Sequence, residues 1–249
     1  MFLNKLPILK RIIPSIRKRY YIYLSKKIFW INIDNIFYKI DIRQKHDRQF
    51  FFERKYEEEN FNFIKKNKFF DDKFIFIDIG CNIGIYSLFF AKNYKNCIKI
   101  ISFEPTFEVF QRFSSSIKKN LEENIIDAYN IALSDIDGKK KMKGLTVKNY
   151  TQYATFEISE FGEVEVSVKK FDNLYSYQNK NLFIKCDVEG HELMIIKGME
   201  KNLKRNNCLL QVEIFEDNFS KTNKQLENYG FRMLGVTNEK DSYFYSNKS

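Results

Sequence analysis

The segment from 74 to 92 constrains the fold of this chain more than any other. Residues 74–79 are apolar or β-branched apart from one acid, Asp78, which predicts a buried strand. Gly80 and Gly84 follow directly, and a helical pattern begins after them. Glycine allows unusual backbone dihedrals and the close approach of a ligand. Because open α/β sheets bind nucleotides at the carboxyl ends of their strands, the segment predicts a nucleotide-like ligand.

The spacing of this turn narrows the kind of ligand. The dinucleotide fingerprint G-x-G-x-x-G uses three glycines to cradle a pyrophosphate. Here Asp78, Gly80 and Gly84 follow the pattern D-x-G-x-x-x-G, and Asn82 stands where the middle glycine would be. A pyrophosphate is therefore disfavoured, and a ligand with a sulfonium and an amino-acid tail fits better.

A second buried strand, 98–103, ends in Glu104, which lies 24 residues after Gly80 (104 − 80). A carboxylate can accept hydrogen bonds from both hydroxyls of a ribose, and an acid at the end of the second strand suits that role. The interval is close to the distance that a helical crossover between two strands requires. Glu104 therefore predicts a ribose in the ligand.

The rest of the chain alternates strands with helices. Further strands are expected near 126–132, 182–186 and 209–214, and helices near 51–66, 85–93, 108–120, 192–204 and 221–229. Two closely spaced strands at 231–236 and 243–245 predict an antiparallel hairpin at one edge. This order predicts an α/β fold with a Rossmann-like, doubly wound, mostly parallel sheet.

The domain organisation follows from the same patterns. Alternating residues at 28–42, with Asp34 and Asn35 as the turn, predict a hairpin. We expect a basic N-terminal arm and hairpin over 1–45, and a main domain over 46–249. A β-rich insertion at about 139–170 is expected within that domain.

The composition is that of a globular protein. At 249 residues, with 44% hydrophobic and 17% aromatic residues, the chain can bury a core of its own. The formal net charge is +10, but richness in Lys, Ile, Asn and Phe is typical of an AT-biased genome. A solubilising surface and an anionic partner therefore both stay open as explanations of the charge.

The cysteines and the hydropathy indicate a compartment. None of Cys81, Cys97, Cys186 and Cys208 forms a C-x-x-C pair, which favours buried free thiols over a metal or disulfide framework. No apolar run reaches the roughly 18–20 residues of a membrane span, and no signal-peptide pattern is found. We therefore expect a cytoplasmic protein.

Residues 1–27 have a different character, because basic residues alternate there with Leu, Ile and Tyr and no acid occurs. Such a segment can lie on anionic lipid, here at the inner face of a membrane. It can equally be a helical arm that packs on its own domain or on a second copy in a homo-oligomer. Pro7 and Pro14 break any continuous helix.

A second cluster of chemistry-bearing residues follows the fourth predicted strand. Asp187, Glu189, His191 and Glu192 fall within six positions, and Glu213 ends the next strand. These strand ends face the same crevice as the glycine turn. Carboxylates and a histidine there can bind a divalent cation or supply a general base. A helix-dipole role for Glu192 and a first-turn hydrogen bond for His191 are the structural alternatives.

Five short motifs are shared with a known family. They are F-I-D-I-G-C-N-I-G from 76, F-E-P-T from 103, I-A-L-S-D from 131, K-C-D-V-E-G-H-E from 185 and I-K-G-M from 196. Together they closely resemble the FkbM family of S-adenosylmethionine-dependent methyltransferases. The first motif alone marks class I methyltransferases in general, and the D-V-E-G segment with the K-G helix is the specific part. The resemblance runs from about Phe50 to Phe215, with Cys81 and Cys186 in place of the usual residues.

The resemblance implies a seven-stranded class I sheet with an antiparallel edge strand, and S-adenosylmethionine as cofactor. It implies that the cofactor-binding residues are Asp78, Gly80, Cys81, Asn82, Gly84, Glu104, Ser134 and Asp135, with Glu104 on the ribose and the last two at the adenine edge. Asp187, Glu189 and His191 would face the acceptor. Family members are similar to O-methyltransferases that act on sugar hydroxyls, so a sugar or sugar-nucleotide substrate is expected.

Two routes of proton removal stay open. Asp187 or His191 could take the proton of the acceptor hydroxyl, or a Mg²⁺ or Mn²⁺ ion held by Asp187 and Glu213 could lower the pKa of that hydroxyl. Two other functions also stay open, a non-catalytic assembly protein and an RNA methyltransferase, which the basic charge would suit. The chain lacks an N-P-P-Y motif and a cysteine after proline, so no nucleic-acid partner is expected.

Overall fold

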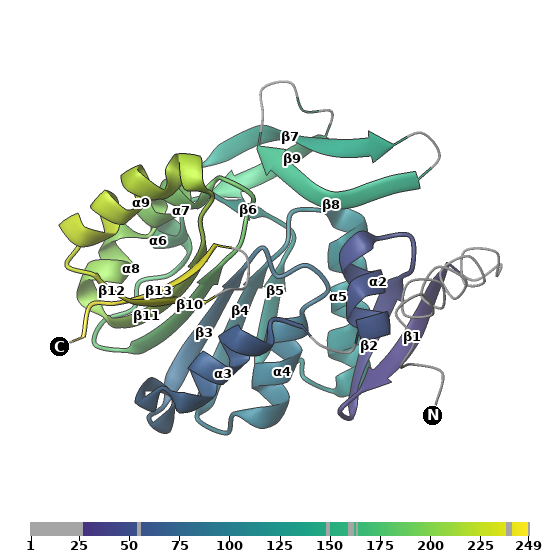
Figure 1. Ribbon diagram of the computed structural model, residues 1–249, viewed down its shortest axis with the longest axis horizontal. Coiled ribbons are helices and arrows are strands. Elements are labelled where there is room, and N and C mark those ends of the chain that lie inside the picture. The colour runs from purple at the N-terminus through teal and green to yellow at the C-terminus, as the bar shows by residue number, and fades with distance from the viewer. Residues whose placement is uncertain are drawn as a thin grey trace, which may run out of the picture.

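The computed structural model describes residues 27–53, 56–147, 150–158, 162, 164–237 and 241–248. Its centre is a seven-stranded sheet in the order β12-β13-β11-β10-β3-β4-β5 (Figure 1). These strands are β3 (Phe74–Ile79), β4 (Cys97–Phe103), β5 (Ile126–Tyr129), β10 (Asn181–Cys186), β11 (Asn207–Glu213), β12 (Arg232–Thr237) and β13 (Ser242–Ser246). The expected Rossmann-like, mostly parallel sheet is confirmed. The closing hairpin forms one edge, and within it β13 is antiparallel to both of its neighbours.

Helices cover both faces of this sheet, as the alternation along β3 requires. Phe74 and Phe76 pack into one apolar cluster, whereas Ile75 and Ile77 pack into the other. The first face carries α3 (Glu58–Lys66), α4 (Ile85–Asn93) and α5 (Phe107–Asn120). The second face carries α6 (Phe171–Leu174), α7 (Glu192–Gly198), α8 (Glu200–Arg205) and α9 (Glu216–Asn228) (Figure 1).

Three expected elements were wrong in their continuity. The helix expected at 51–66 is two helices, α2 (Lys45–Glu53) and α3, because Glu57 between them has a left-handed φ of 45°. The helix expected at 192–204 breaks at Met199 into α7 and α8. The strand expected at 126–132 ends at Tyr129, since Ala132 and Leu133 pair with another sheet as β6.

That second sheet has four strands in the order β6-β9-β7-β8. It contains β6 (Ala132–Leu133), β7 (Gly138–Val147), β8 (Tyr150–Ile158) and β9 (Val164–Lys169), so its last three strands fall in the segment expected to be β-rich. Met142, Val166 and Val168 form a small apolar cluster of their own with Ala132. The second sheet therefore has its own packing, separate from the two faces of the main sheet.

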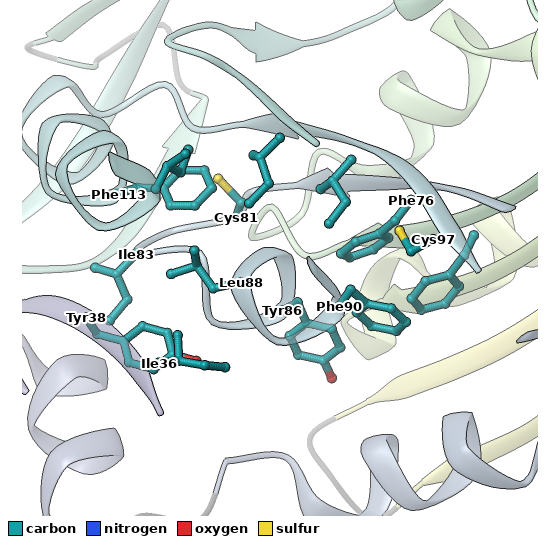
Figure 2. Close-up of a cluster of buried hydrophobic side chains, with 14 of the residues drawn as sticks. Ile36, Tyr38, Phe76, Cys81, Ile83, Tyr86, Leu88, Phe90, Cys97 and Phe113 are labelled. Atoms are coloured by element: carbon teal, nitrogen blue, oxygen red, sulfur yellow. The ribbon is translucent and has the colours of Figure 1, made fainter. Parts of the chain in front are cut away.

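The predicted hairpin is present as β1 (Ile28–Ile33) and β2 (Ile36–Asp41), with the expected turn residues at φ of 51° and 63°. It packs on α5, where the Asn120 side chain accepts from the Phe37 N–H at 2.9 Å and donates to the Phe37 carbonyl at 2.8 Å. Ile36 and Tyr38 join the apolar cluster of α4 and α5 (Figure 2). The hairpin is thus bound to the main domain.

Helix α2 is held on the same helix α5 by a buried ion pair between Asp47 and Arg112. Asp47 also accepts from the Asp41 N–H at 2.7 Å, which joins α2 to the end of β2. The arm predicted at 1–27 lies outside the described residues except for Lys27. Within the described part of the chain, no helix is both long and apolar enough to span a membrane.

Candidate functional site

A cavity opens where β3, β4 and β10 end, at the edge of the sheet that the sequence indicated. Eight of the predicted site residues line it, namely Asp78, Gly80, Cys81, Asn82, Glu104, Asp187, Glu189 and His191. Four others do not line it, namely Gly84, Ser134, Asp135 and Glu213. The fold therefore brings most of both predicted clusters to one space.

Asp78 lines this cavity, and its side chain is buried. Its Oδ2 accepts from the Ser87 hydroxyl at 2.5 Å, whereas its Oδ1 is buried without a hydrogen-bond partner among the described residues. Burial raises the pKa of Asp78 to about 6, although Lys185 and Ser87 act in the opposite direction. Because an unsatisfied buried carboxylate oxygen is costly, its position beside a cavity fits a ligand with a cationic, hydrogen-bonding group.

The glycine turn packs backbone against backbone. Gly80 has a φ of 76°, and a Cβ there would lie 2.0 Å from the Asp187 carbonyl oxygen. Only glycine therefore allows the ends of β3 and β10 to meet. Gly84 instead faces Phe113, whose ring would lie 2.0 Å from an added Cβ. Its place is in helix packing, which explains why it is absent from the cavity wall.

Cys81 is the apolar member of the turn. It lines the cavity and belongs to the same buried cluster as Phe113 (Figure 2). Burial raises the pKa of its thiol well above the usual range, and the negative charges of Asp78 and Glu104 raise this pKa further. The thiol is therefore neutral and acts as a small hydrophobic surface.

Glu104 is fixed by backbone donors on both of its oxygens. Oε1 accepts from the Thr106 N–H at 2.8 Å, and Oε2 accepts from the Asn82 N–H at 3.1 Å. Burial raises the pKa of Glu104, and these hydrogen bonds partly oppose that effect. The Thr106 side chain also donates to Glu104, and since a carboxylate has about four acceptor positions, it can still accept from a hydroxyl of a ligand.

Asp187 is the central acid of the second cluster. The buried Lys185 ammonium donates to its Oδ2 at 2.8 Å. Burial, the largest effect, raises the pKa of Asp187, but Lys185, a hydrogen bond from Glu213 and His46 together outweigh burial, and the pKa lies below its usual value. Asp187 is therefore ionised at neutral pH, with 24% of its side chain exposed.

Glu213 behaves in the opposite way. Burial first, and then the charge of Asp187, raise the pKa of Glu213 to about 9. Glu213 thus holds a proton at neutral pH and donates it in a hydrogen bond to Asp187. Among the described residues, no group of three or more His, Cys, Asp and Glu could hold a metal ion. The expected Mg²⁺ or Mn²⁺ site at these two acids therefore has no support in the geometry.

His191 connects the cavity to the predicted adenine edge. Its Nε2 lies 3.0 Å from the Ser134 hydroxyl, which in turn donates to Asp135 at 3.2 Å. Burial lowers the pKa of His191 to about 4, and the charge of Lys140 adds to this. The imidazole is therefore uncharged at neutral pH. His191 lines the cavity, whereas Ser134 and Asp135, which continue this chain of hydrogen bonds, do not.

Two glutamates shape the loop that carries these groups. Glu189 has a left-handed φ of 57° and is followed by Gly190 at 96°. The buried Glu192 accepts from the Gly190 N–H at 2.9 Å. Glu192 therefore holds the turn at the start of α7, and it lies in the first turn of that helix, where the sequence left a helix-dipole role open.

Other cavity residues were not predicted from the sequence. Among them are His46, Asp47 and Tyr56 before the first central strand, Met142 on β7, and Lys185 in β10. A lysine within an otherwise apolar run was a local signal for the last of these. The first four carry no local signal, because only tertiary packing brings them to the cavity.

The sheet order and the glycine turn at the cavity define the class of S-adenosylmethionine-dependent methyltransferases. The sequence matches the methyltransferase FkbM domain over residues 78–233, which is more than half of the chain. The chain belongs to the FkbM methyltransferase family. A search of curated proteins gave no match.

Several solved structures are similar to this chain. Methyltransferase FkbM from Methylobacillus flagellatus KT shares 15% identity at a TM-score of 0.49, over 71% of this chain and 44% of that one. M. jannaschii TYW2 in complex with AdoMet shares 9% identity at a TM-score of 0.45, over 90% of this chain and 85% of that one. The Pyrococcus abyssi tRNA (uracil-54, C5)-methyltransferase shares 10% identity at a TM-score of 0.48, over 90% of this chain and 44% of that one. The chain thus spans less than half the length of the first and third.

Proposed function

We propose that this methyltransferase transfers a methyl group from S-adenosylmethionine to a hydroxyl oxygen of a sugar, either nucleotide-activated or part of a surface polysaccharide. The observation that carries the proposal is a single cavity whose lining includes Asp78, Glu104 and an ionised Asp187. One cavity can therefore hold a donor and an acceptor hydroxyl together.

The donor side fits the cofactor. The unpartnered Asp78 oxygen and the turn at Gly80 and Asn82 would hold the methionine part, and Glu104 would accept from the ribose hydroxyls. When bound, the cofactor supplies a methyl group activated by a sulfonium. The carboxylates around it favour a positively charged ligand.

Asp187 is the group best placed to take the proton. Lys185 keeps it ionised and fixes one of its oxygens, whereas the Nε2 of the neutral His191 already contacts Ser134. A sugar hydroxyl is far less acidic than a carboxylic acid, so Asp187 would accept the proton only as the oxygen gains the methyl group. Metal assistance stays a second route, which the assay distinguishes.

The test is transfer of a labelled methyl group to a panel of nucleotide sugars and polysaccharide fragments. We expect Asp187→Asn to lower kcat by about 10²–10⁴-fold, the usual contribution of a general base, with cofactor affinity nearly unchanged. Loss of activity in excess EDTA, restored by Mg²⁺ or Mn²⁺, would support the metal route instead. A panel in which no sugar accepts the label would contradict the proposal.

An RNA acceptor is the second candidate, favoured by the formal net charge of +10. The cavity itself argues against it, because acids outnumber its one lysine and would repel phosphates. Total tRNA in the same assay decides between the two. Salt-sensitive labelling of tRNA, with none of the sugars, would replace the sugar proposal.

A further inference from the structure

Residues 46–53 and 56, which precede the matched family domain, contribute three side chains to the cavity, and besides Asp47, which pairs with Arg112, these are His46 and Tyr56. We propose that these two side chains contact the methyl acceptor and select an uncharged, hydroxyl-bearing ring. This assignment rests on the proposed function, because it concerns the acceptor of that reaction. We call residues 46–53 and 56 the acceptor wall.

The acceptor wall lines the same cavity as Asp187. The ring of Tyr56 contacts that of Tyr86, and the Lys185 ammonium, which donates to Asp187 at 2.8 Å, lies 4.9 Å from the centre of the Tyr86 ring. His46 is among the groups whose interaction lowers the pKa of Asp187. Burial, then Glu57, then Asp187 raise the pKa of the Tyr56 hydroxyl. Both side chains are therefore close to the acid that faces the acceptor.

The wall is held firmly at its Tyr56 end. Glu57, in its left-handed conformation, accepts from the Tyr86 hydroxyl at 2.5 Å and from the Gln211 side chain at 3.4 Å. The ring of Tyr56 contacts those of Phe50 and Tyr86 edge to face, at centroid distances of 5.8 and 6.4 Å. Because α4 and β11 supply these anchors, Tyr56 is positioned by the main domain itself.

The other end of the wall is equally fixed. Asp47, next to His46, forms the buried pair with Arg112 on α5 and accepts from the Asp41 N–H. His46 itself is half-buried at the first turn of α2. A wall anchored at both ends can present two side chains in a fixed geometry, which specific recognition requires.

The chemistry of the cavity limits what the wall can select. Five carboxylates line the cavity, from Asp47, Asp78, Glu104, Asp187 and Glu189, against the ammonium of Lys185. The charge of Arg112 balances that of Asp47. The other four carboxylates outnumber the single ammonium of Lys185, so the cavity has a net negative charge. A phosphate would be repelled here, whereas hydroxyls can donate to carboxylates and an aromatic ring can cover the apolar face of a sugar ring. The phosphates of an activated sugar would therefore stay outside.

The composition of the chain provides a direct probe, since its two histidines are His46 and His191 and both line the cavity. In protein labelled with ¹³C-histidine and saturated with S-adenosylhomocysteine, two ring signals can be assigned with His46→Asn and His191→Asn. Methyl hexopyranosides and the matching hexose 1-phosphates are then titrated. We expect a saturable shift of the His46 signal with an uncharged glycoside, and weaker binding of its 1-phosphate.

Variants separate contact from folding. Tyr56→Ala and His46→Ala should each raise the Kd of that glycoside, and KM in the transfer assay, by about tenfold or more, with cofactor affinity unchanged. Lys45→Ala, exposed beside His46, is the matched control and should behave as the native protein. His46→Ala replaces a half-buried side chain, so it keeps the test valid if the first variant fails to fold.

The outcomes distinguish this assignment from the reaction. A sugar that accepts methyl groups without moving the His46 signal would overturn the assignment, as would tighter binding of the 1-phosphate. A His46 response in a protein that methylates no sugar would support the assignment and contradict the proposed reaction. Methylation of tRNA with no response to any glycoside would overturn both.

Discussion

Asp78 shows how a single residue constrains function. Its side chain is 1% exposed, and one of its oxygens has no partner among the described residues. A buried charge that is incompletely paired lowers stability, so a carboxylate at this position indicates a compensating partner. Lys185, opposite Asp78 in the register of β3 and β10, is part of that compensation. A bound cation would supply the rest.

Replacing Asp78 by Asn should weaken cofactor binding about tenfold to a hundredfold, because hydrogen bonds to charged groups contribute about 1.5–3 kcal/mol. Calorimetric titration with S-adenosylmethionine measures this directly. Ser102→Ala is the control, since Ser102 contacts Ser87 at 2.8 Å and does not line the cavity. Equal affinity in both variants would contradict the role of Asp78.

The pH dependence of binding follows from the same residue. The pKa of Asp78 is raised to about 6, so the carboxyl is increasingly protonated below that pH. The ionised form attracts a cationic ligand, and cofactor affinity should therefore rise from pH 5 to pH 7 and level off above. Calorimetry across this range tests the slope. Persistence of the slope in Asp78→Asn would assign it to another group.

At the scale of elements, close approach between α7 and the start of the second sheet decides the geometry behind His191. A Cβ at Gly198 would lie 2.0 Å from the Ser134 carbonyl oxygen. The glycine of the I-K-G-M motif therefore lets α7 pack directly on this backbone. Ser134 can then contact His191 at 3.0 Å.

Gly198→Ala should destabilise the protein, although alanine favours a helix by about 1 kcal/mol. The clash is with backbone, which cannot rotate away, and overpacking of this kind costs about 1–3 kcal/mol or more. Urea unfolding measures the change. The control is Gly235→Ala, whose added Cβ would meet Phe63 at an ordinary 3.7 Å. Native stability of both variants would contradict the packing argument.

At the scale of the whole molecule, the segment before the matched domain is an integral part of the structure. The β1–β2 hairpin is hydrogen-bonded to Asn120 on α5, and α2 forms an ion pair with Arg112 on the same helix. This docking places the acceptor wall over the cavity. The matched family domain, residues 78–233, therefore does not contain all of the residues that line the cavity.

Asp47→Ala tests this docking. It leaves the buried Arg112 charge unpaired, and breaking such a pair costs about 3–5 kcal/mol. Glu200→Ala removes one partner of the half-exposed pair with Lys204, for which about 0.5 kcal/mol or less is expected. The free energy of unfolding in urea should separate the two variants clearly. A similar small loss in both would show that α2 is held by other contacts.

Local patterns were sufficient for the core of the fold and for eight of the residues that line the cavity. The buried strand before Gly80 and the acids Glu104 and Asp187 follow a general rule, that parallel strands end at one edge of a sheet. Periodicity identified each central strand, and five motifs indicated the family. These features are encoded within a few consecutive residues, so the sequence alone predicted them.

Contacts between distant residues decided the rest. Glu57 interrupts a helix with a left-handed backbone and accepts a hydrogen bond from Tyr86, 29 positions away, and Gly84 faces Phe113 instead of the cavity. No local sequence pattern encodes such contacts between distant residues. The sequence by itself determined the sheet, its polar edge and the class of cofactor. Only the tertiary structure showed that His46 and Tyr56 complete the cavity, because their place depends on anchors supplied by other helices and strands.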